Sequence, residues 1–240
     1  MILEVYTMKY TIKGDSDCPL LEVSLAPTET IKMERGSMVY LSNVSLEGKM
    51  NSQKKGLGGL LGAIGRSVTS GESMFITQAS GVGPNAFVGI APSIPGKLTC
   101  LHVGGNTQYC LNTGAFVACD DSVNYQMQAQ DLGKAFFGGT GGLFVMKTVG
   151  SGDIIVSSFG DILAVEVSHD RPMTIDNEHV VAWDASLDYQ IQIASGTFGF
   201  TTGEGLVNVF HGNGTVYIQT RNIHNLADAL KPYLPQNNGN

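Results

Sequence analysis

The stretch from Leu98 to Gln128, LTCLHVGGNTQYCLNTGAFVACDDSVNYQMQ, recurs later in the same chain. It aligns without a gap with Ile162 to Gln192, ILAVEVSHDRPMTIDNEHVVAWDASLDYQIQ, at a constant offset of 64, and eight of the 31 pairs are identical. The identical pairs are Val103/Val167, Val117/Val181, Ala118/Ala182, Asp120/Asp184, Ser122/Ser186, Tyr125/Tyr189, Gln126/Gln190 and Gln128/Gln192. A weaker third copy runs from Leu20 to Val39 at an offset of 78 and is matched mainly at apolar positions. Repetition on this scale indicates units that cover one another's apolar faces.

Apolar residues alternate with polar ones inside each long copy. In the first copy the alternating pairs are Leu101 with Val103 and Tyr109 with Leu111, and the second copy repeats this pattern. A period of two predicts half-buried strands, and residues that favour turns, such as Gly104 to Asn106, separate them. Each copy therefore predicts strand, turn, strand, turn, strand, and the chain predicts an all-β fold.

A second short element follows each copy. It reads Ser-Gly-Glu at 70–72, Ser-Gly-Asp at 151–153 and Thr-Gly-Glu at 202–204. We expect Gly71, Gly152 and Gly203 to occupy equivalent turns with positive φ, each opening a strand. The strands that follow are expected to end in hairpins at Gly160 and at 212–214. The carboxylates at the third position of each element are interpreted as strand-start residues and not as a cation site.

The repeat favours one domain over residues 1–235, with units at about 15–95, 96–160 and 161–220. We expect the core to be shared between Val103, Leu111 and Val117 of one copy and Val167, Ile175 and Val181 of the next. A short helix is predicted over Leu226 to Leu230 with Asn225 as its N-cap. The polar tail at 236–240 is predicted to be disordered.

Composition excludes several classes of protein. Hydrophobic residues make up 42% of the 240-residue chain and charged residues 15%, as expected for a globular protein with a large core. The net charge is −7, and the longest basic run is Lys54–Lys55, so a nucleic-acid partner is not expected. The N-terminus lacks the pattern of a secretory signal, and no apolar run is long enough to span a membrane. We therefore expect a soluble, cytoplasmic protein.

The cysteine and histidine spacing gives no known metal or catalytic pattern. Cys18, Cys100, Cys110 and Cys119 form no CxxC pair, and no two histidines lie one residue apart as a cupin-type site would require. No GxSxG elbow is present. The sequence thus predicts no metal, no cofactor and no catalytic residue.

A glycine-rich segment, Gly56 to Arg66, interrupts the strand pattern. Its apolar residues are Leu57, Leu60, Leu61 and Ile64, and Arg66 closes it. Three readings stay open: the segment packs on its own domain, its leucines contact a partner or a membrane surface, or its backbone amides and Arg66 bind an anion.

The chain also resembles a known family. The motifs are the Gly-Gly-Leu segment ending at Arg66, the Ser-Gly-Glu at 70–72, Pro-Gly-Lys-Leu at 95–98 and LKPYLP at 230–235. Over about residues 15–235 they resemble the AIM24 family, formerly domain of unknown function 124. The resemblance implies a β-sandwich similar to the tryptophan RNA-binding attenuation protein (TRAP), with three repeats around a pseudo-threefold axis. Fungal relatives are mitochondrial and linked to inner-membrane organisation. The family offers no established catalytic residues to carry over.

These observations favour a non-catalytic scaffold or binding protein of the AIM24 type. The alternatives are a peripheral membrane protein or a small-ligand or anion-binding protein that uses the 56–66 segment, and, less favoured, an enzyme with a site between repeats. The expected partners are another protein, a membrane surface or a second copy of the chain.

Overall fold

The computed structural model describes residues 7–14, 17–50, 75–129, 144–194 and 205–235. These residues form four antiparallel sheets and one short C-terminal helix, α3 (Ile223–Leu230). The predicted all-β class is therefore confirmed. The strands predicted in the two long copies are confirmed as well, from β8 to β10 and from β14 to β16, with bounds given below.

The four sheets are as follows. The first contains, in spatial order, β1 (Lys9–Lys13), β2 (Leu20–Leu25), β7 (Ala86–Ile90) and β4 (Met38–Ser42). The second contains β5 (Val44–Met50), β6 (Phe75–Gly81), β3 (Thr30–Glu34), β10 (Phe116–Asp120), β13 (Gly152–Ser157) and β8 (Leu98–Val103). The third contains β11 (Val123–Ala129), β12 (Phe144–Gly150), β9 (Tyr109–Asn112), β16 (Val180–Asp184), β19 (Gly214–Gln219) and β14 (Ile162–Val167). The fourth contains β15 (Met173–Asp176), β18 (Leu206–His211) and β17 (Asp188–Ile193).

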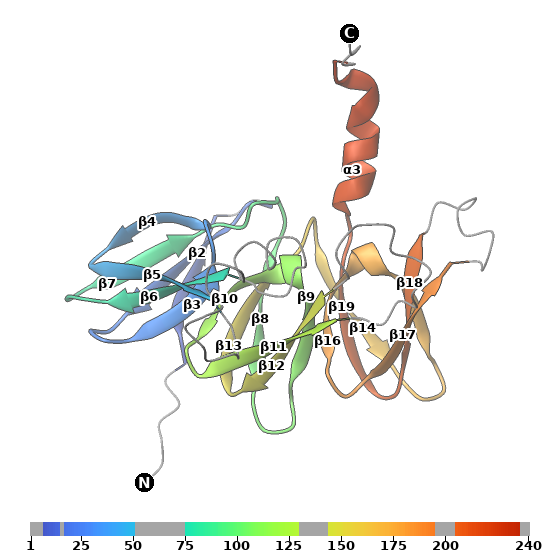
Figure 1. Cartoon of the computed structure of the whole chain (residues 1–240), viewed down its shortest axis with the longest axis horizontal. Helices are drawn as coiled ribbons and strands as arrows, with labels where there is room; N and C mark the ends of the chain where they lie inside the picture. Colours follow the sequence, from blue (N-terminus) through green and yellow to red (C-terminus); the bar gives the residue numbers. More distant parts are fainter. Residues whose placement is uncertain (1–6, 15–16, 51–74, 130–143, 195–204, 236–240) are drawn as a thin grey trace, which may run out of the picture.

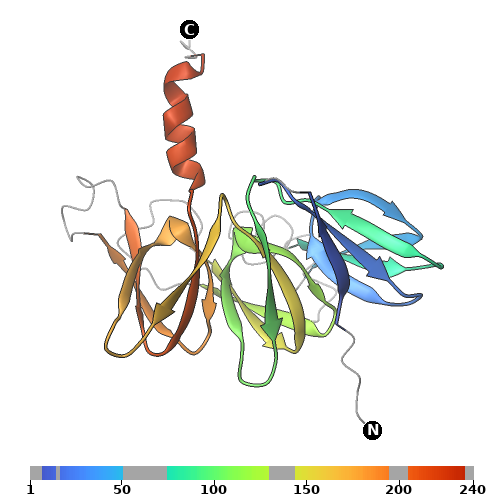
Figure 2. The same cartoon turned by 180° about the vertical axis from the view of Figure 1, so that it is seen from behind.

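Three β lobes lie side by side along the longest axis of the molecule (Figures 1 and 2). The first lobe contains β1 to β7, the second β8 to β13 and the third β14 to β19. Each six-stranded sheet crosses a lobe boundary, because β3 pairs with β10 and β9 pairs with β16. The lobes are therefore joined by continuous backbone hydrogen-bond ladders.

The two strand pairings that join the lobes, β3 with β10 and β9 with β16, are here called joints, and they have the same register. Ala118 in β10 pairs with Met33 in β3, and Ala182 in β16 pairs with Leu111 in β9. The residues before them form a β-bulge at equivalent positions, centred on Val117 and Val181. A third bulge, between Met38 and Tyr40 in β4, has the same place in the first lobe.

The bulges join the three apolar cores. Val117 packs in the core of the first lobe, and Val181 packs in the core of the second, so each bulge sends a side chain into the preceding lobe. The second core also contains Val103 and Leu111, whereas Val167 and Ile175 pack in the third. Sharing of the core between copies is thus confirmed, but through the bulge residues rather than through all six predicted positions. The third core is built around Trp183 and Phe210, whose rings lie 5.6 Å apart.

Three local predictions are wrong. No hairpin forms at Gly160 or at 212–214, because the flanking strands, β13 and β14 or β18 and β19, belong to different sheets. The strands after the three short elements were expected to be equivalent, and they are not. The Ser-Gly-Asp at 151–153 opens β13, which lies between β10 and β8. The strands after the other two elements are β6, which lies between β5 and β3, and β18, which lies between β15 and β17. The helix begins at Ile223, and Asn222, not Asn225, is its N-cap: the Asn222 side chain accepts a hydrogen bond from the Asn225 backbone N–H. Local spacing could not choose between two capping asparagines so close together.

Candidate functional site

The glycine-rich candidate site, residues 56–66, belongs to a part of the chain that the structure does not describe. Leu57, Leu60, Leu61, Ile64 and Arg66 lie outside the described residues, and so do Gly71 and Gly203. Gly152 is described and has φ of +141°. An added Cβ at Gly152 would lie 2.6 Å from Asp120 Oδ2, so both conformation and space favour glycine here.

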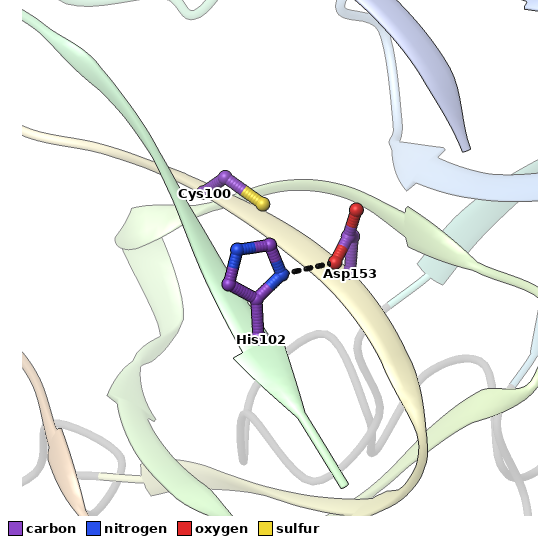
Figure 3. Close-up of side chains that lie close together, drawn as sticks. All are labelled: Cys100, His102 and Asp153. Carbon is purple, nitrogen blue, oxygen red and sulfur yellow. Dashed lines mark hydrogen bonds and ion pairs between the residues drawn. The ribbon is translucent and has the colours of Figure 1, made fainter. Parts of the chain in front are cut away.

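The structure instead brings together a polar group that the sequence analysis missed. Cys100, His102 and Asp153, here called the polar cluster, offer ligand atoms that all lie within 4.8 Å of one another (Figure 3). Cys100 and His102 are two residues apart on β8 and therefore share a face, and Asp153 lies opposite His102 on β13. His102 Nδ1 is 2.6 Å from Asp153 Oδ1. The signal in the sequence was a Cys-x-His pair on a predicted strand, but its acidic partner follows only from the strand pairing.

Burial differs sharply within the polar cluster. The His102 side chain is 81% exposed, whereas that of Asp153 is 9% exposed. The backbone N–H of Asp153 donates to Asp120 Oδ2 at 2.6 Å, and that of Met8 donates to Asp120 Oδ1 at 2.7 Å. The buried carboxylate of Asp120 is thus held by backbone amides directly behind the cluster.

Burial also shifts the pKa values of these groups. Desolvation raises the pKa of Asp120 above its ordinary value although two backbone N–H groups donate to it, and the nearby charge of Asp153 adds to the rise. Desolvation likewise raises the pKa of the Cys100 thiol. A hydrogen bond with Cys100, with burial, raises the pKa of Tyr10 to about 12. A raised pKa favours the thiol of Cys100 over the thiolate, and a thiol is a poor nucleophile.

The other lobes carry different residues at these positions. Glu166 and Thr215 pair across β14 and β19 as His102 and Asp153 pair across β8 and β13. In the first lobe the paired residues are Ser24 and Phe87. A combination of sulfur, nitrogen and carboxylate donors therefore occurs at this position only in the second lobe.

A second feature is a pair of strands with an unpaired edge, β4 and β15, here called the open edges. In the described residues β4 pairs only with β7, and β15 pairs only with β18. The strands equivalent to β4 are β10 and β16, and each of these has a partner on both sides. The open edges are thus the positions at which the ladder that joins the lobes stops.

The side chains of β4 are unusually apolar for an exposed edge. Met38, Val39, Tyr40 and Leu41 are 36–54% exposed. The equivalent residues of β10, Phe116 to Cys119, are at most 1% exposed. Exposed apolar edge strands favour pairing with another chain.

The helix α3 presents a further apolar surface. It stands away from the row of lobes (Figures 1 and 2), and none of its residues is buried. Ile223, Leu226 and Leu230 are spaced so that they share one face, and they are 40–50% exposed. Among the described residues no helix has the length and apolarity to span a membrane.

Comparison with known proteins gives the family. The model described as "Mitochondrial biogenesis AIM24" matches residues 10–221. The chain belongs to the AIM24 family. An uncharacterized protein of Streptococcus pyogenes serotype M6 is 47% identical over 230 residues, which cover 95% of this chain and 92% of that protein. A crystal structure of a Streptococcus pyogenes protein, determined by a structural genomics consortium, is 44% identical, covers 95% of this chain and 100% of its own, and superposes with a TM-score of 0.77.

Proposed function

We propose that this AIM24 family member is a non-catalytic scaffold that assembles head to tail through its open edges. The proposal includes three repeats, at about 15–95, 96–160 and 161–220, with the TRAP-like fold that the resemblance implies. The recurring bulges at Val39, Val117 and Val181 support the repeats. The pseudo-threefold axis that the resemblance implies is not part of the proposal, because β4 and β15 lie at opposite ends of the row of lobes (Figure 1).

One observation carries the assembly: β4 is exposed where its equivalents are buried. β10 is covered because β3 pairs with it, and β16 is covered because β9 does. The strand equivalent to β3 and β9 in the third lobe is β15, which has no such partner in the described residues. A second copy therefore offers the edge that β4 lacks, and the chain itself contains the same joint twice.

The offsets of the repeat predict the register of the joint. Extending the observed pairs, Ala118 with Met33 and Ala182 with Leu111, places Tyr40 opposite Ile175 of the next copy. Leu41 then lies opposite Thr174. Val39, as the bulge residue, would enter the third-lobe core of that copy as Val117 and Val181 enter the preceding lobes.

The contact is heterologous. β4 belongs to the lobe at one end of the row and β15 to the lobe at the other end (Figure 1), so two different surfaces meet. Such contacts form closed rings when the rotation closes and filaments when it does not. Either product repeats α3 along its length, and the apolar face of α3 supports a protein or membrane surface as the further partner.

The non-catalytic part of the proposal rests on the state of the polar cluster. Burial raises the pKa of the Cys100 thiol and so disfavours the thiolate that a nucleophilic cysteine needs. The alternatives that use the 56–66 segment concern residues outside the described ranges.

Sedimentation velocity over a range of concentrations tests the assembly. The 25.4 kDa chain should sediment as an oligomer, and Val39→Asp with Leu41→Asp should reduce it to a monomer, because charge cannot enter the joint. Leu163→Asp is the matched control: Leu163 is an exposed apolar residue, 51% accessible, on β14. A wild-type chain that stays monomeric at every concentration would overturn the proposal, as would dissociation of the control.

A further inference from the structure

We infer that the polar cluster is a binding site for a divalent transition metal of the zinc type, with Cys100, His102 and Asp153 as its three protein ligands. The site would have a thiolate, an imidazole and a carboxylate, which are the donors that Zn²⁺ takes in proteins. It is independent of the assembly proposed above.

The sheet preorganises the ligands. Cys100 and His102 project from one face of β8, and Asp153 comes from the neighbouring strand in direct register with His102. β13 is an interior strand held on both sides, by β10 and β8. The three donor atoms already lie within 4.8 Å of one another, so rotation of side chains, without backbone movement, suffices to close them around an ion.

The exposure of His102 lets a metal ion reach the site and lets the imidazole ring turn toward it. Because His102 is 81% exposed, its ring can turn so that a metal takes the place of the proton shared with Asp153. The buried carboxylate of Asp153 stays fixed beneath it. Three protein ligands leave a fourth tetrahedral position for water.

Local charge favours a cation. Asp120 and Asp153 place two carboxyl groups side by side, since the backbone N–H of Asp153 donates to Asp120 Oδ2 at 2.6 Å. None of the ion pairs found among the described residues joins a lysine or arginine to either group. A bound metal ion would supply the missing positive charge and would stabilise the Cys100 thiolate.

The rest of the chain provides an internal comparison. Glu166 and Thr215 form a cross-strand pair at the equivalent place in the third lobe, with Thr215 Oγ1 donating to Glu166 Oε1 at 3.2 Å. That pair has no sulfur or imidazole donor, since Ala164 stands where the second lobe has Cys100. In the third lobe, β14 and β19 therefore form a side-chain hydrogen bond at this position without a cysteine or a histidine.

Calorimetric titration of tag-free full-length protein with Zn²⁺, followed by Co²⁺ substitution, tests the inference. We expect one equivalent to bind, and the Co²⁺ form to show a thiolate-to-cobalt charge-transfer band. Removal of outer-shell partners alone weakens metal sites by 10–100-fold, so His102→Ala and Cys100→Ser should each weaken binding by at least about 100-fold. His102 is exposed, so its replacement should leave the thermal midpoint unchanged.

Two controls make the result decisive. Cys18→Ser and His169→Ala, which change an exposed cysteine and an exposed histidine elsewhere, should bind Zn²⁺ like the wild type. The Val39→Asp, Leu41→Asp chain should also retain one equivalent, whether or not the assembly exists. Absence of stoichiometric binding, unchanged binding by His102→Ala, or a cobalt spectrum without a thiolate band would overturn the site.

Discussion

The strands β4 and β10 occupy the same place in successive lobes, yet one is exposed and the other is buried. Val39 and Val117 are both bulge residues, aligned by the repeat, and their exposed fractions are 54% and 0%. The difference does not come from the residue type, which is valine in both. It comes from the second neighbour: β10 pairs with β3 as well as with β13, whereas β4 pairs only with β7 among the described residues.

The first and second lobes are each completed by a strand from the next lobe. A bulge residue enters the core of the preceding lobe at two of its three occurrences, and the third, Val39 in β4, enters no core among the described residues. Burying a valine side chain fully stabilises a protein by about 1.5–3 kcal/mol. Burial of Val39 in a contact with another chain would therefore be favourable, as burial of Val117 and Val181 is within the chain.

Cutting the chain after Gly160 should have the largest effect. The product lacks β14 to β19, so β9 loses its partner β16 and the second core loses Val181. We expect an aggregated or unfolded product by circular dichroism and size-exclusion chromatography, because the exposed edge and core cannot be covered. A monomeric, cooperatively unfolding 1–160 fragment would show that the lobes are independent domains.

The next largest effect is expected from an aspartate at the buried bulge residue Val181, compared with an aspartate at the exposed bulge residue Val39. Val181→Asp buries a carboxylate without a partner and should destabilise the fold by more than about 3 kcal/mol in urea unfolding. Val39→Asp should leave a soluble chain with a single cooperative transition, because Val39 is half exposed within one chain. Equal losses of stability at both positions would contradict the contrast between a filled and an open joint.

A smaller effect is expected at Gly214, where the Asp184 side chain leaves no room for a Cβ. An alanine Cβ at Gly214 would lie 2.8 Å from Asp184 Oδ2, whereas in the first lobe Ser42 and Ala86 stand at the equivalent places. Gly214→Ala should therefore cost roughly 1–3 kcal/mol. Adding Asp184→Ser, which copies the first lobe, should restore part of that stability; no recovery in the double variant would show that the carboxylate is not the obstacle.

The smallest effect concerns pH. Burial raises the pKa of Asp184 although the Thr215 backbone N–H donates to it, so the folded state binds a proton more readily than the unfolded state. Its contribution to stability is therefore greatest below the ordinary aspartate pKa and is lost as pH rises through the raised value. Asp184→Asn should flatten the decline in thermal midpoint between pH 4 and pH 7, by the equivalent of about 1 kcal/mol or less. An unchanged pH profile would count against the raised pKa.

The sequence predicted the strands better than their partners. Alternation at positions such as Leu101 and Val103 follows from the burial of one face, and each copy shows it. Pairing between β3 and β10, or the assignment of β18 and β19 to different sheets, depends on contacts distant in sequence that no local period records. Hairpins were therefore predicted where the chain changes sheet.

Residues of the candidate sites could likewise be grouped from the sequence only where they lie close together in it. Cys100 and His102 could be placed on one strand face from their spacing, but Asp153 joins them only through the β8–β13 register. The open edges were likewise invisible in sequence, because Val39 reads as a core residue by its match to Val117. Its exposure depends on a neighbouring strand that is absent from that edge among the described residues.

Disulfide trapping at the predicted register tests whether β4 of one copy pairs with β15 of the next. A Cys18→Ser chain carrying Leu41→Cys and Thr174→Cys would place the two thiols opposite each other at the joint between copies, and Leu41→Cys with Asp176→Cys is the control, shifted by two residues. On mild oxidation, we expect covalent oligomers in non-reducing electrophoresis for the first pair, far fewer for the shifted pair, and their loss on reduction. Chains that stay monomeric with both pairs, or that cross-link equally in both registers, would contradict assembly through β4 and β15.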